Sequence, residues 1–263
     1  MKVITLTTDF GSADWFVGTM KGVILGINPR VQIVDITHDI PAGNIRAGAF
    51  ALAASHRFFP VRTIHVAVVD PGVGSQRKPL AIQTEHHLFV GPDNGVLSFA
   101  LANEKIKAVH QVTNERFFHP PVSHTFHGRD VFAPMAAHLS KGVPIQKLGP
   151  VAGDFVRLDW PQPQFSQNGT RGEILYIDRF GNAITNIDHS ALAQFDLARC
   201  ELVVKRKRLC RVCSFYQAVP AGKPVAVPGS SGFLEVAVNG GSAARVFRLQ
   251  VGDPVTVRQR RLQ

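Results

Sequence analysis

A carboxylate, a guanidinium and an imidazole that could together activate a water molecule stand in the first half of the sequence. Asp70 follows the apolar run 63–69, and the segment DPGVGSQR carries the chain to Arg77. Arg77 can fold back across this glycine-containing turn and keep the Asp70 carboxylate ionised. His127 stands shortly before a helix predicted from Val131, and polar ligands bind well near a helix N-terminus. These three groups could orient and polarise a water molecule.

A second acid occupies the same kind of position. Asp9 follows the β-rich run 3–8, just as Asp70 follows its own strand. In an open parallel sheet, ligands bind outside the carboxyl ends of the strands, where both acids are expected. Structural alternatives remain open, because each Asp could simply cap the turn after it. Likewise, Asp70 and Arg77 could form a salt bridge that steadies a loop, and His127 could be a hydrogen-bonded structural residue.

These side chains need a scaffold that brings strand ends together, and residues 1–160 have the pattern for one. Strand signals occupy 3–8, 31–37, 63–69, 80–84 and 87–90, and helix signals occupy 14–27, 47–58 and 131–141. Strands that alternate with helices predict an α/β domain, with a mostly parallel sheet covered by helices on both faces.

The second part of the chain has a different character. Residues 161–172 are rich in Pro and Gly, have no apolar period, and predict a linker. Residues 173–263 contain short β-like runs separated by turns of Gly, Pro and Asn. This pattern predicts a small all-β sandwich or barrel, and therefore a second domain.

Two turn motifs in the predicted β domain carry polar groups that could bind a small ligand. In the first, Asp178, Phe180 and Asn182 surround a glycine turn; the second is the segment PGSSGFLEVAVNGG at 228–241. Both could equally be hairpin turns without a ligand.

Composition restricts the class of protein. The chain has 263 residues, of which 45% are hydrophobic, and this suits one large or two modest folded domains rather than a disordered chain. No apolar run approaches the roughly 18–20 residues that span a bilayer, and the N-terminus lacks the apolar region of a signal peptide. Three cysteines form no disulfide framework, so we expect a cytoplasmic protein.

The net charge of +10 does not by itself indicate a nucleic-acid partner. Most of the excess comes from two short runs, 205–211 and 258–261, which are typical of a solvated surface or tail. Cys210 and Cys213 form a C-x-x-C without a second pair, which is a weak zinc signal. The chain has no P-loop, no dinucleotide fingerprint, no H-E-x-x-H and no G-x-S-x-G.

Six ordered blocks of the sequence resemble the S-adenosyl-L-methionine (SAM) hydroxide adenosyltransferases, relatives of the fluorinase and chlorinase. The blocks are LTTDFG (6–11), VVDPGVGS (68–75), FVGPDNGVLS (89–98), TFHGRDVFAP (125–134), IDRFGNAITNI (177–187) and SSGFLEVAVN (230–239). The resemblance implies an α/β N-terminal domain and a small β-barrel C-terminal domain. It also implies a homotrimer, with each active site between the N-terminal domain of one subunit and the C-terminal domain of the next.

The resemblance also implies roles for individual residues. The water-activating set of the family corresponds to Asp70, Arg77 and His127, and the halogenating relatives depart from this trio. The implied substrate-binding residues are Asp9, Asp14, Asp178, Phe180, Asn182, Tyr216, Ser230, Ser231, Glu235, Val238 and Gly240.

Within this set, Asp9 corresponds to the acid that holds the ribose hydroxyls. Asp14 and Asp178 correspond to acids near the methionine end, with the two serines beside them. Phe180 and Asn182 correspond to adenosine contacts, and the backbone near Val238 and Gly240 to contacts with the adenine edge. Tyr216 corresponds to the aromatic residue that stacks on adenine, although Phe215 could be aligned there instead.

The implied reaction is attack of water or hydroxide on the 5′ carbon of SAM, which yields adenosine and L-methionine. It requires no metal and no cofactor, since the sulfonium is already a good leaving group. Two alternatives stay open, namely halide transfer to SAM and a protein that binds SAM or adenosine without turnover. Two features depart from the family pattern: Gly43 replaces a pocket Trp of the fluorinase, and the basic and Cys-containing segment 205–213 has no counterpart.

Overall fold

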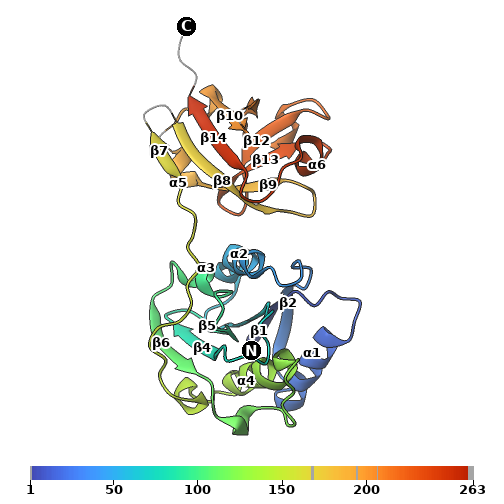
Figure 1. Ribbon diagram of the computed structural model, residues 1–263, viewed down its shortest axis with the longest axis vertical. Coiled ribbons are helices and arrows are strands. Elements are labelled where there is room, and N and C mark those ends of the chain that lie inside the picture. Colours follow the sequence, from blue (N-terminus) through green and yellow to red (C-terminus); the bar gives the residue numbers. More distant parts are fainter. Residues whose placement is uncertain (1, 167–168, 194, 206, 260–263) are drawn as a thin grey trace. The chain divides into compact units, whose positions relative to one another are not determined.

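The computed structural model describes residues 2–166, 169–193, 195–205 and 207–259, and Figure 1 traces the chain through them. Contacts between Cα atoms divide the chain into two compact units, Met1–Asp159 and Trp160–Gln263. Each unit has its own sheet and its own hydrophobic core.

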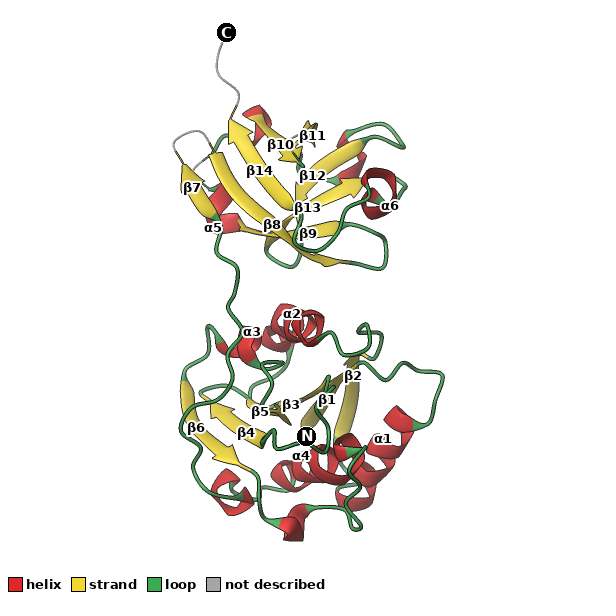
Figure 2. Cartoon of the chain, viewed as in Figure 1, coloured by secondary structure: helices red, strands yellow, loops and turns green. Residues whose placement is uncertain are grey.

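The first unit is built on a mixed sheet flanked by helices (Figure 2). Its strands are β1 (Val3–Thr8), β2 (Gln32–Thr37), β3 (Ile64–Val68), β4 (Pro79–Thr84), β5 (Leu88–Pro92) and β6 (Ile106–Gln111). Its helices are α1 (Phe16–Ile27), α2 (Ile45–Ser55), α3 (Ser98–Leu101) and α4 (Ala133–Ser140), with shorter helical turns η1 (His56–Phe58), η2 (Glu115–Phe117), η3 (Gly128–Phe132) and η4 (Ile145–Leu148).

The strand order in this sheet is β2-β1-β3-β5-β4-β6. β2, β1, β3 and β5 run parallel to one another, as the alternation of strands and helices predicts. β4 is antiparallel to both β5 and β6, so the sheet is mixed. The reason is local, because β4 and β5 are joined by a short hairpin, which forces antiparallel pairing.

Alternate side chains of the central strands lie in two different environments. Ile4 and Leu6 of β1 are fully buried in a cluster with Met20 of α1 and with residues of α4. Gly48 of α2 lies so close to Val69, just after β3, that a Cβ on this glycine would come within 2.8 Å of a Val69 methyl. Helices therefore pack against the central strands. The polar residues that follow β1 and β3 lie beyond these packed side chains, at the ends of the strands.

The second unit is an antiparallel, nearly closed barrel. Its strands are β7 (Gln164–Ser166), β8 (Gly169–Ile177), β9 (Ala183–Asp188), β10 (Cys200–Val204), β11 (Lys207–Arg211), β12 (Pro224–Pro228), β13 (Phe233–Val238) and β14 (Pro254–Gln259). Short helices α5 (His189–Leu192) and α6 (Ala243–Phe247), and the turns η5 (Leu197–Arg199) and η6 (Tyr216–Ala218), connect them.

The barrel order is β11-β10-β14-β8-β9-β13-β12, with β7 added on β8. A bridge between Val212 and Ala226 joins the chain after β11 to β12, so the two ends of the sheet meet. Inward-facing residues such as Leu202, Leu234 and Val257 are fully buried in its core.

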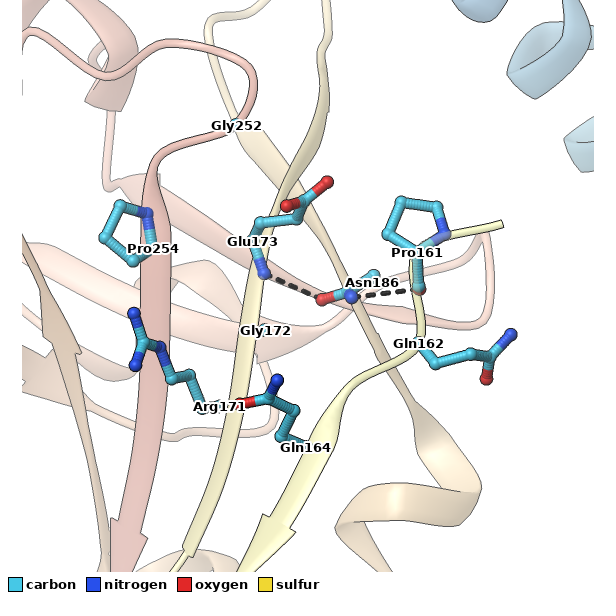
Figure 3. A pocket seen from close by; sticks show the side chains of 9 residues that line it. All are labelled: Pro161, Gln162, Gln164, Arg171, Gly172, Glu173, Asn186, Gly252 and Pro254. Carbon is cyan, nitrogen blue, oxygen red and sulfur yellow. Dashed lines mark hydrogen bonds between the residues drawn. The ribbon is translucent and has the colours of Figure 1, made fainter. Parts of the chain in front are cut away.

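The segment 161–172 is part of this barrel rather than a linker. β7 lies within it and pairs with the start of β8, although the β7 side chains are all exposed. A strand with no buried face has no apolar alternation, so its sequence reads like a loop. Figure 3 shows how Asn186 fastens this segment: it accepts from Glu173 N at 2.8 Å and donates to the Pro161 carbonyl at 3.0 Å, beside a polar hollow of about 460 Å³.

Candidate active site

The Asp70 turn of the first unit packs against the segment that carries His127. Asp70 follows β3, and its carbonyl accepts from Val73 N at 3.2 Å, which closes the turn. Gly74 has a φ of +76°, and a Cβ there would collide with the His124 carbonyl oxygen. Only glycine meets both requirements, so the DPGVG sequence is what allows these two distant segments to come together.

Asp70, Arg77 and His127 form one hydrogen-bonded group. Arg77 Nε donates to Asp70 Oδ1 at 3.1 Å and to Oδ2 at 2.9 Å, and Arg77 Nη2 also donates to Oδ2. The same Nη2 lies 2.7 Å from His127 Nδ1. The Arg77 guanidinium lies 5.4 Å from the centre of the Phe132 ring, and its side chain is 9% exposed. The guanidinium is therefore fixed between the carboxylate and the imidazole.

This geometry determines the tautomer of His127. A guanidinium can only donate hydrogen bonds, so His127 Nδ1 must accept, and the ring proton lies on Nε2. Burial and the charge of Arg77 lower the pKa of His127 below its usual value, against the opposing effects of Asp70 and Asp130. At neutral pH the ring is thus neutral, with Nε2–H free to donate to a ligand or water.

Asp130 holds the loop around His127, a role that the sequence pattern did not reveal. The π-helical turn η3 begins directly after His127, and Asp130 within it is fully buried. The carboxylate accepts from Ser123 N at 2.9 Å and from Arg129 Nε at 2.6 Å. Burial alone would raise the pKa of Asp130, but these hydrogen bonds lower it, so the group is a carboxylate.

Asp9 lies at the neighbouring strand end. Its Oδ2 accepts from Gly43 N at 2.7 Å, and a Cβ on Gly43 would be 3.7 Å from Pro71 in the Asp70 turn. Gly43 also has a φ of +70°, which explains a glycine at this position. Asp14 is exposed in the segment before α1. The two acids predicted at strand ends thus share one edge of the sheet.

The predicted binding residues of the second unit gather around one cavity of about 840 Å³. Its lining is Asp178, Phe180, Asn182, Phe215, Tyr216, Gln217, Ser230, Glu235, Val238, Asn239, Gly240 and Gly241. Ser231, which was predicted together with Ser230, is not part of this lining, and its buried hydroxyl has no hydrogen-bond partner.

Two pairs of side chains shape the cavity. Asn182 donates to Asp178 twice, from its backbone N at 2.8 Å and from Nδ2 at 3.0 Å. Tyr216 Oη donates to Glu235 Oε2 at 2.7 Å. Burial and the nearby Asp178 raise the pKa of Glu235 above its usual value, although the hydrogen bond from Tyr216 opposes this shift. Burial and the Glu235 carboxylate raise the pKa of Tyr216, so the phenol stays protonated and the ring is held in place.

Aromatic rings beside this pair offer flat apolar surfaces. Phe180 is 78% exposed, Phe215 is 60% exposed and Tyr216 is 41% exposed on the cavity wall. Exposed aromatic side chains of this kind suit the face of a planar heterocycle. The cavity therefore combines stacking surfaces with a carboxylate, an amide and a hydroxyl.

Comparisons with known proteins identify the family of the chain. The profile of the SAM hydroxide adenosyltransferase N-terminal domain matches residues 4–149, and that of the C-terminal domain matches residues 172–256. The chain belongs to the SAM hydroxide adenosyltransferase family. This confirms the resemblance found in the six sequence blocks.

Relatives that align over nearly the whole chain include enzymes named (R)-S-adenosyl-L-methionine hydrolase. The one from Salinispora arenicola is 39% identical over 97% of both chains, and the one from Thermus thermophilus is 37% identical over 97% of this chain and 99% of its own. A fluorinase from Actinoplanes sp. is 27% identical over 97% of both chains. A crystal structure of an uncharacterized conserved protein from Thermotoga maritima superposes with a TM-score of 0.92 at 34% identity, covering 98% of this chain and all of its own.

Gln217 is a cavity residue that the motifs did not identify, whereas Asn239 and Gly241 belong to the motif at 228–241. Gln217 and Gly241 line the cavity, as does Asn239, whose Nδ2 donates to the Val219 carbonyl at 2.7 Å. Gln217 follows Tyr216 directly, but nothing in its own sequence context marks it as a ligand contact.

The described residues of the cysteine motif and of the basic run contact other residues of the second unit. Cys210 packs in the barrel core, whereas Cys213 packs against a separate cluster of Val225 and Val227, and no group of acidic, His and Cys side chains among the described residues could hold a metal ion. Lys205 Nζ bonds the Arg248 carbonyl and Asp253 Oδ2, each at 2.8 Å. Arg206, Arg260 and Arg261 lie outside the described residues.

None of the helices in the described part of the chain is long and apolar enough to cross a bilayer.

Proposed function

We propose that this protein hydrolyses SAM to adenosine and L-methionine, with the substrate in the (R) configuration at sulfur. The observation that carries the proposal is the Asp70–Arg77–His127 group, found in a chain that is 39% identical to an (R)-S-adenosyl-L-methionine hydrolase over almost its full length. The fluorinase is more distant, at 27% identity, and the family resemblance implies that the halogenating relatives depart from this trio. Water is therefore favoured over halide as the nucleophile.

The reaction is a displacement at the ribose 5′ carbon. The oxygen of water forms a bond to C5′ while the C5′–S bond breaks. The electron pair of the C5′–S bond stays on sulfur, which becomes the neutral thioether of methionine. No general acid is needed, because the sulfonium leaves without a proton. The protein must hold water in line with the C5′–S bond and accept the proton that the water loses.

The hydrogen bonds support a division of these tasks among individual groups. His127 Nδ1 accepts from Arg77, so His127 can meet the water only through its Nε2–H, as a donor. The proton of the water therefore goes to Asp70. Asp70 Oδ2 accepts twice from Arg77, whereas Oδ1 accepts once, at 3.1 Å, which leaves Oδ1 the better acceptor for water.

The remaining residues bind the substrate. Asp9 takes the ribose hydroxyls and Asp14 attracts the cationic methionine end by charge. In the second unit, the rings of Phe180 and of Tyr216 or Phe215 stack on adenine, while the backbone at Val238 and Gly240 meets its edge. Asp178, Asn182, Ser230 and Glu235 complete the binding set, and Ser231 stands beside Ser230 with its own hydroxyl buried.

Incubation of the pure protein with each sulfonium epimer of SAM tests the proposal. We expect equal amounts of adenosine and methionine from the (R) form, at least about tenfold faster than from the (S) form, because in-line attack depends on how the sulfonium is seated. Chromatography resolves the products. Adenosine release at the uncatalysed rate, despite tight adenosine binding, would instead indicate a binding protein. A halogenated adenosine formed after addition of chloride or fluoride would indicate halide transfer.

We also propose that the chain forms homotrimers in the cytoplasm, with each active site built from the first unit of one copy and the second unit of the next. The three free cysteines suit a reducing compartment. The support for shared sites is that the polar groups of the reaction are divided between the two units, with the water-activating group in one and the cavity in the other.

Co-expression of two inactive variants tests the shared site. Asp70→Asn removes the proton acceptor in the first unit, and Asn182→Ala removes a cavity contact in the second. If sites are shared between copies, random trimers of the two variants contain intact sites and recover about a quarter of the wild-type activity. Activity no higher than the average of the two separate variants, in trimers shown to be mixed, would contradict the proposal.

A further inference from the structure

A chain of polar side chains lies directly behind Asp9. Thr8, at the end of β1, places its Oγ1 2.8 Å from His38 Nδ1. His38 follows β2, and its Nε2 lies 3.1 Å from Asp35 Oδ1 within that strand. Lys21 of α1 donates to the other carboxylate oxygen of Asp35 at 2.5 Å. Four residues from three elements are thus linked side by side.

The partners of Thr8 determine which nitrogen of the His38 ring accepts a hydrogen bond. Phe10 N donates to Thr8 Oγ1 at 3.3 Å, so the hydroxyl already accepts one hydrogen bond. Thr8 is fully buried, and His38 Nδ1 is the neighbouring group to which its hydroxyl proton can go. His38 Nδ1 therefore accepts, and its ring proton lies on Nε2, facing Asp35.

The charges around His38 support this arrangement. The contact from Nε2 to Asp35 is close but out of line for a strong hydrogen bond, so the carboxylate attracts the polar N–H of the neutral ring only weakly. Burial raises the pKa of Asp35, but Lys21 and His38 together lower it below its usual value. Asp35 is therefore a carboxylate that orients the His38 ring, and Lys21 balances its charge.

His38 also fixes the backbone on the far side of Asp9. Its carbonyl accepts from Gly11 N at 2.8 Å, and Gly11 has a φ of +68° that only a glycine adopts easily. The residue before Asp9 is thus held by the His38 side chain, and the second residue after it by the His38 carbonyl. The Asp9 carboxylate itself bonds to Gly43 N.

We propose that His38, oriented by Asp35 and Lys21, is a positioning residue that holds Asp9 in the geometry needed to bind the ribose hydroxyls. This inference rests on the proposed function, in which Asp9 binds those hydroxyls. The linked Thr, His and Asp do not form a nucleophilic triad, because the Thr8 hydroxyl is fully buried and cannot reach a substrate. The group acts on the ligand only through Asp9.

The test compares the affinities for adenosine and for 2′,3′-dideoxyadenosine, which lacks both ribose hydroxyls. We expect His38→Ala in the full chain to weaken adenosine binding about tenfold and to leave dideoxyadenosine binding within about twofold. His38→Asn is expected to restore most of the adenosine affinity, because its amide oxygen can accept from Thr8 where Nδ1 did. Isothermal titration calorimetry gives both constants.

Three controls separate the possible causes. His110 bonds the Gly149 carbonyl at 2.9 Å elsewhere in the first unit, and His110→Ala should leave the ratio of the two affinities unchanged. Asp9→Asn should remove the preference for adenosine, and adding His38→Ala to it should change the ratio no further. If Asp9→Asn leaves the preference intact, the ribose role of Asp9 is wrong, and the positioning role falls with it.

The positioning role alone would be overturned if His38→Ala left the ratio of adenosine to dideoxyadenosine affinity unchanged while Asp9→Asn lost the preference for adenosine. Equal weakening of both ligands by His38→Ala would show a general structural role and would overturn it as well. Circular dichroism of each variant checks that it is folded, and His38→Asn gives a second reading if His38→Ala does not fold.

Discussion

Asp70→Asn is expected to lower kcat for SAM hydrolysis by about a thousandfold while changing the affinity for adenosine by less than about threefold. Asparagine has nearly the shape of aspartate, so the turn and its packing against His124 should survive. The variant keeps one oxygen but loses the basic carboxylate that takes the proton of water, and its NH2 group would place donors where one carboxylate oxygen accepts from Arg77. The loss should therefore fall on the chemical step rather than on binding.

Single-turnover kinetics and adenosine titration, performed side by side, separate these two quantities. Asp154 is an exposed acid of the same unit, and Asp154→Asn serves as the matched control, with both quantities unchanged. Loss of binding in proportion to turnover in Asp70→Asn would contradict the role of Asp70 as proton acceptor, and would point to a structural ion pair with Arg77.

The parts of the site that the sequence predicted are those with local signals. Asp70 and Arg77 are separated by seven residues and joined by a turn whose glycines are visible in the sequence. Asp9 was found because it ends a strand with strong β character. In the second unit, Asp178 and Asn182 flank one glycine turn, and their contact is likewise local.

The parts that the sequence did not predict depend on contacts between distant segments. Thr8 and His38 are thirty residues apart, and only the parallel pairing of β1 with β2 brings them together. β6 was missed because this edge strand, IKAVHQ, is only partly buried and has no clean alternation. The run 161–172 was misread as a linker because β7 buries none of its side chains.

Acidification from pH 7 to pH 5 is expected to lower the free energy of unfolding of the first unit by about 2 kcal/mol through His65 alone. His65 lies in β3 with no exposed surface; its Nδ1 bonds Thr5 Oγ1 at 2.8 Å, and its Nε2 has no hydrogen-bond partner. The ring is stacked on Phe89 and lies 4.9 Å from the ring of His87. Burial, reinforced by the neighbouring His87 and His56, lowers the pKa of His65 to about 2.

The sign follows from the protons bound in each state. In the unfolded chain His65 has an ordinary pKa near 6.5, so below that pH the unfolded state binds a proton that the folded state does not. Unfolding is therefore favoured progressively as the pH falls from 6.5 towards 2. The pKa of His87 is lowered by burial as well, which adds to the effect in the same direction. The acids with lowered pKa values, such as Asp130, lose their contribution only below about pH 4, outside this window.

Hydrogen exchange of the β3 amides at pH 7 and pH 5, corrected for the intrinsic rate, measures the change in the opening free energy of this unit. His65→Gln should remove about 2 kcal/mol of the pH dependence even if it lowers stability at both values, and His87→Gln should remove part of it. Exposed His119→Gln is the matched control and should leave the pH dependence as it is. A pH dependence that is the same in His65→Gln as in the wild type would mean that the buried ring takes up a proton in the folded state, and so that its surroundings open without unfolding.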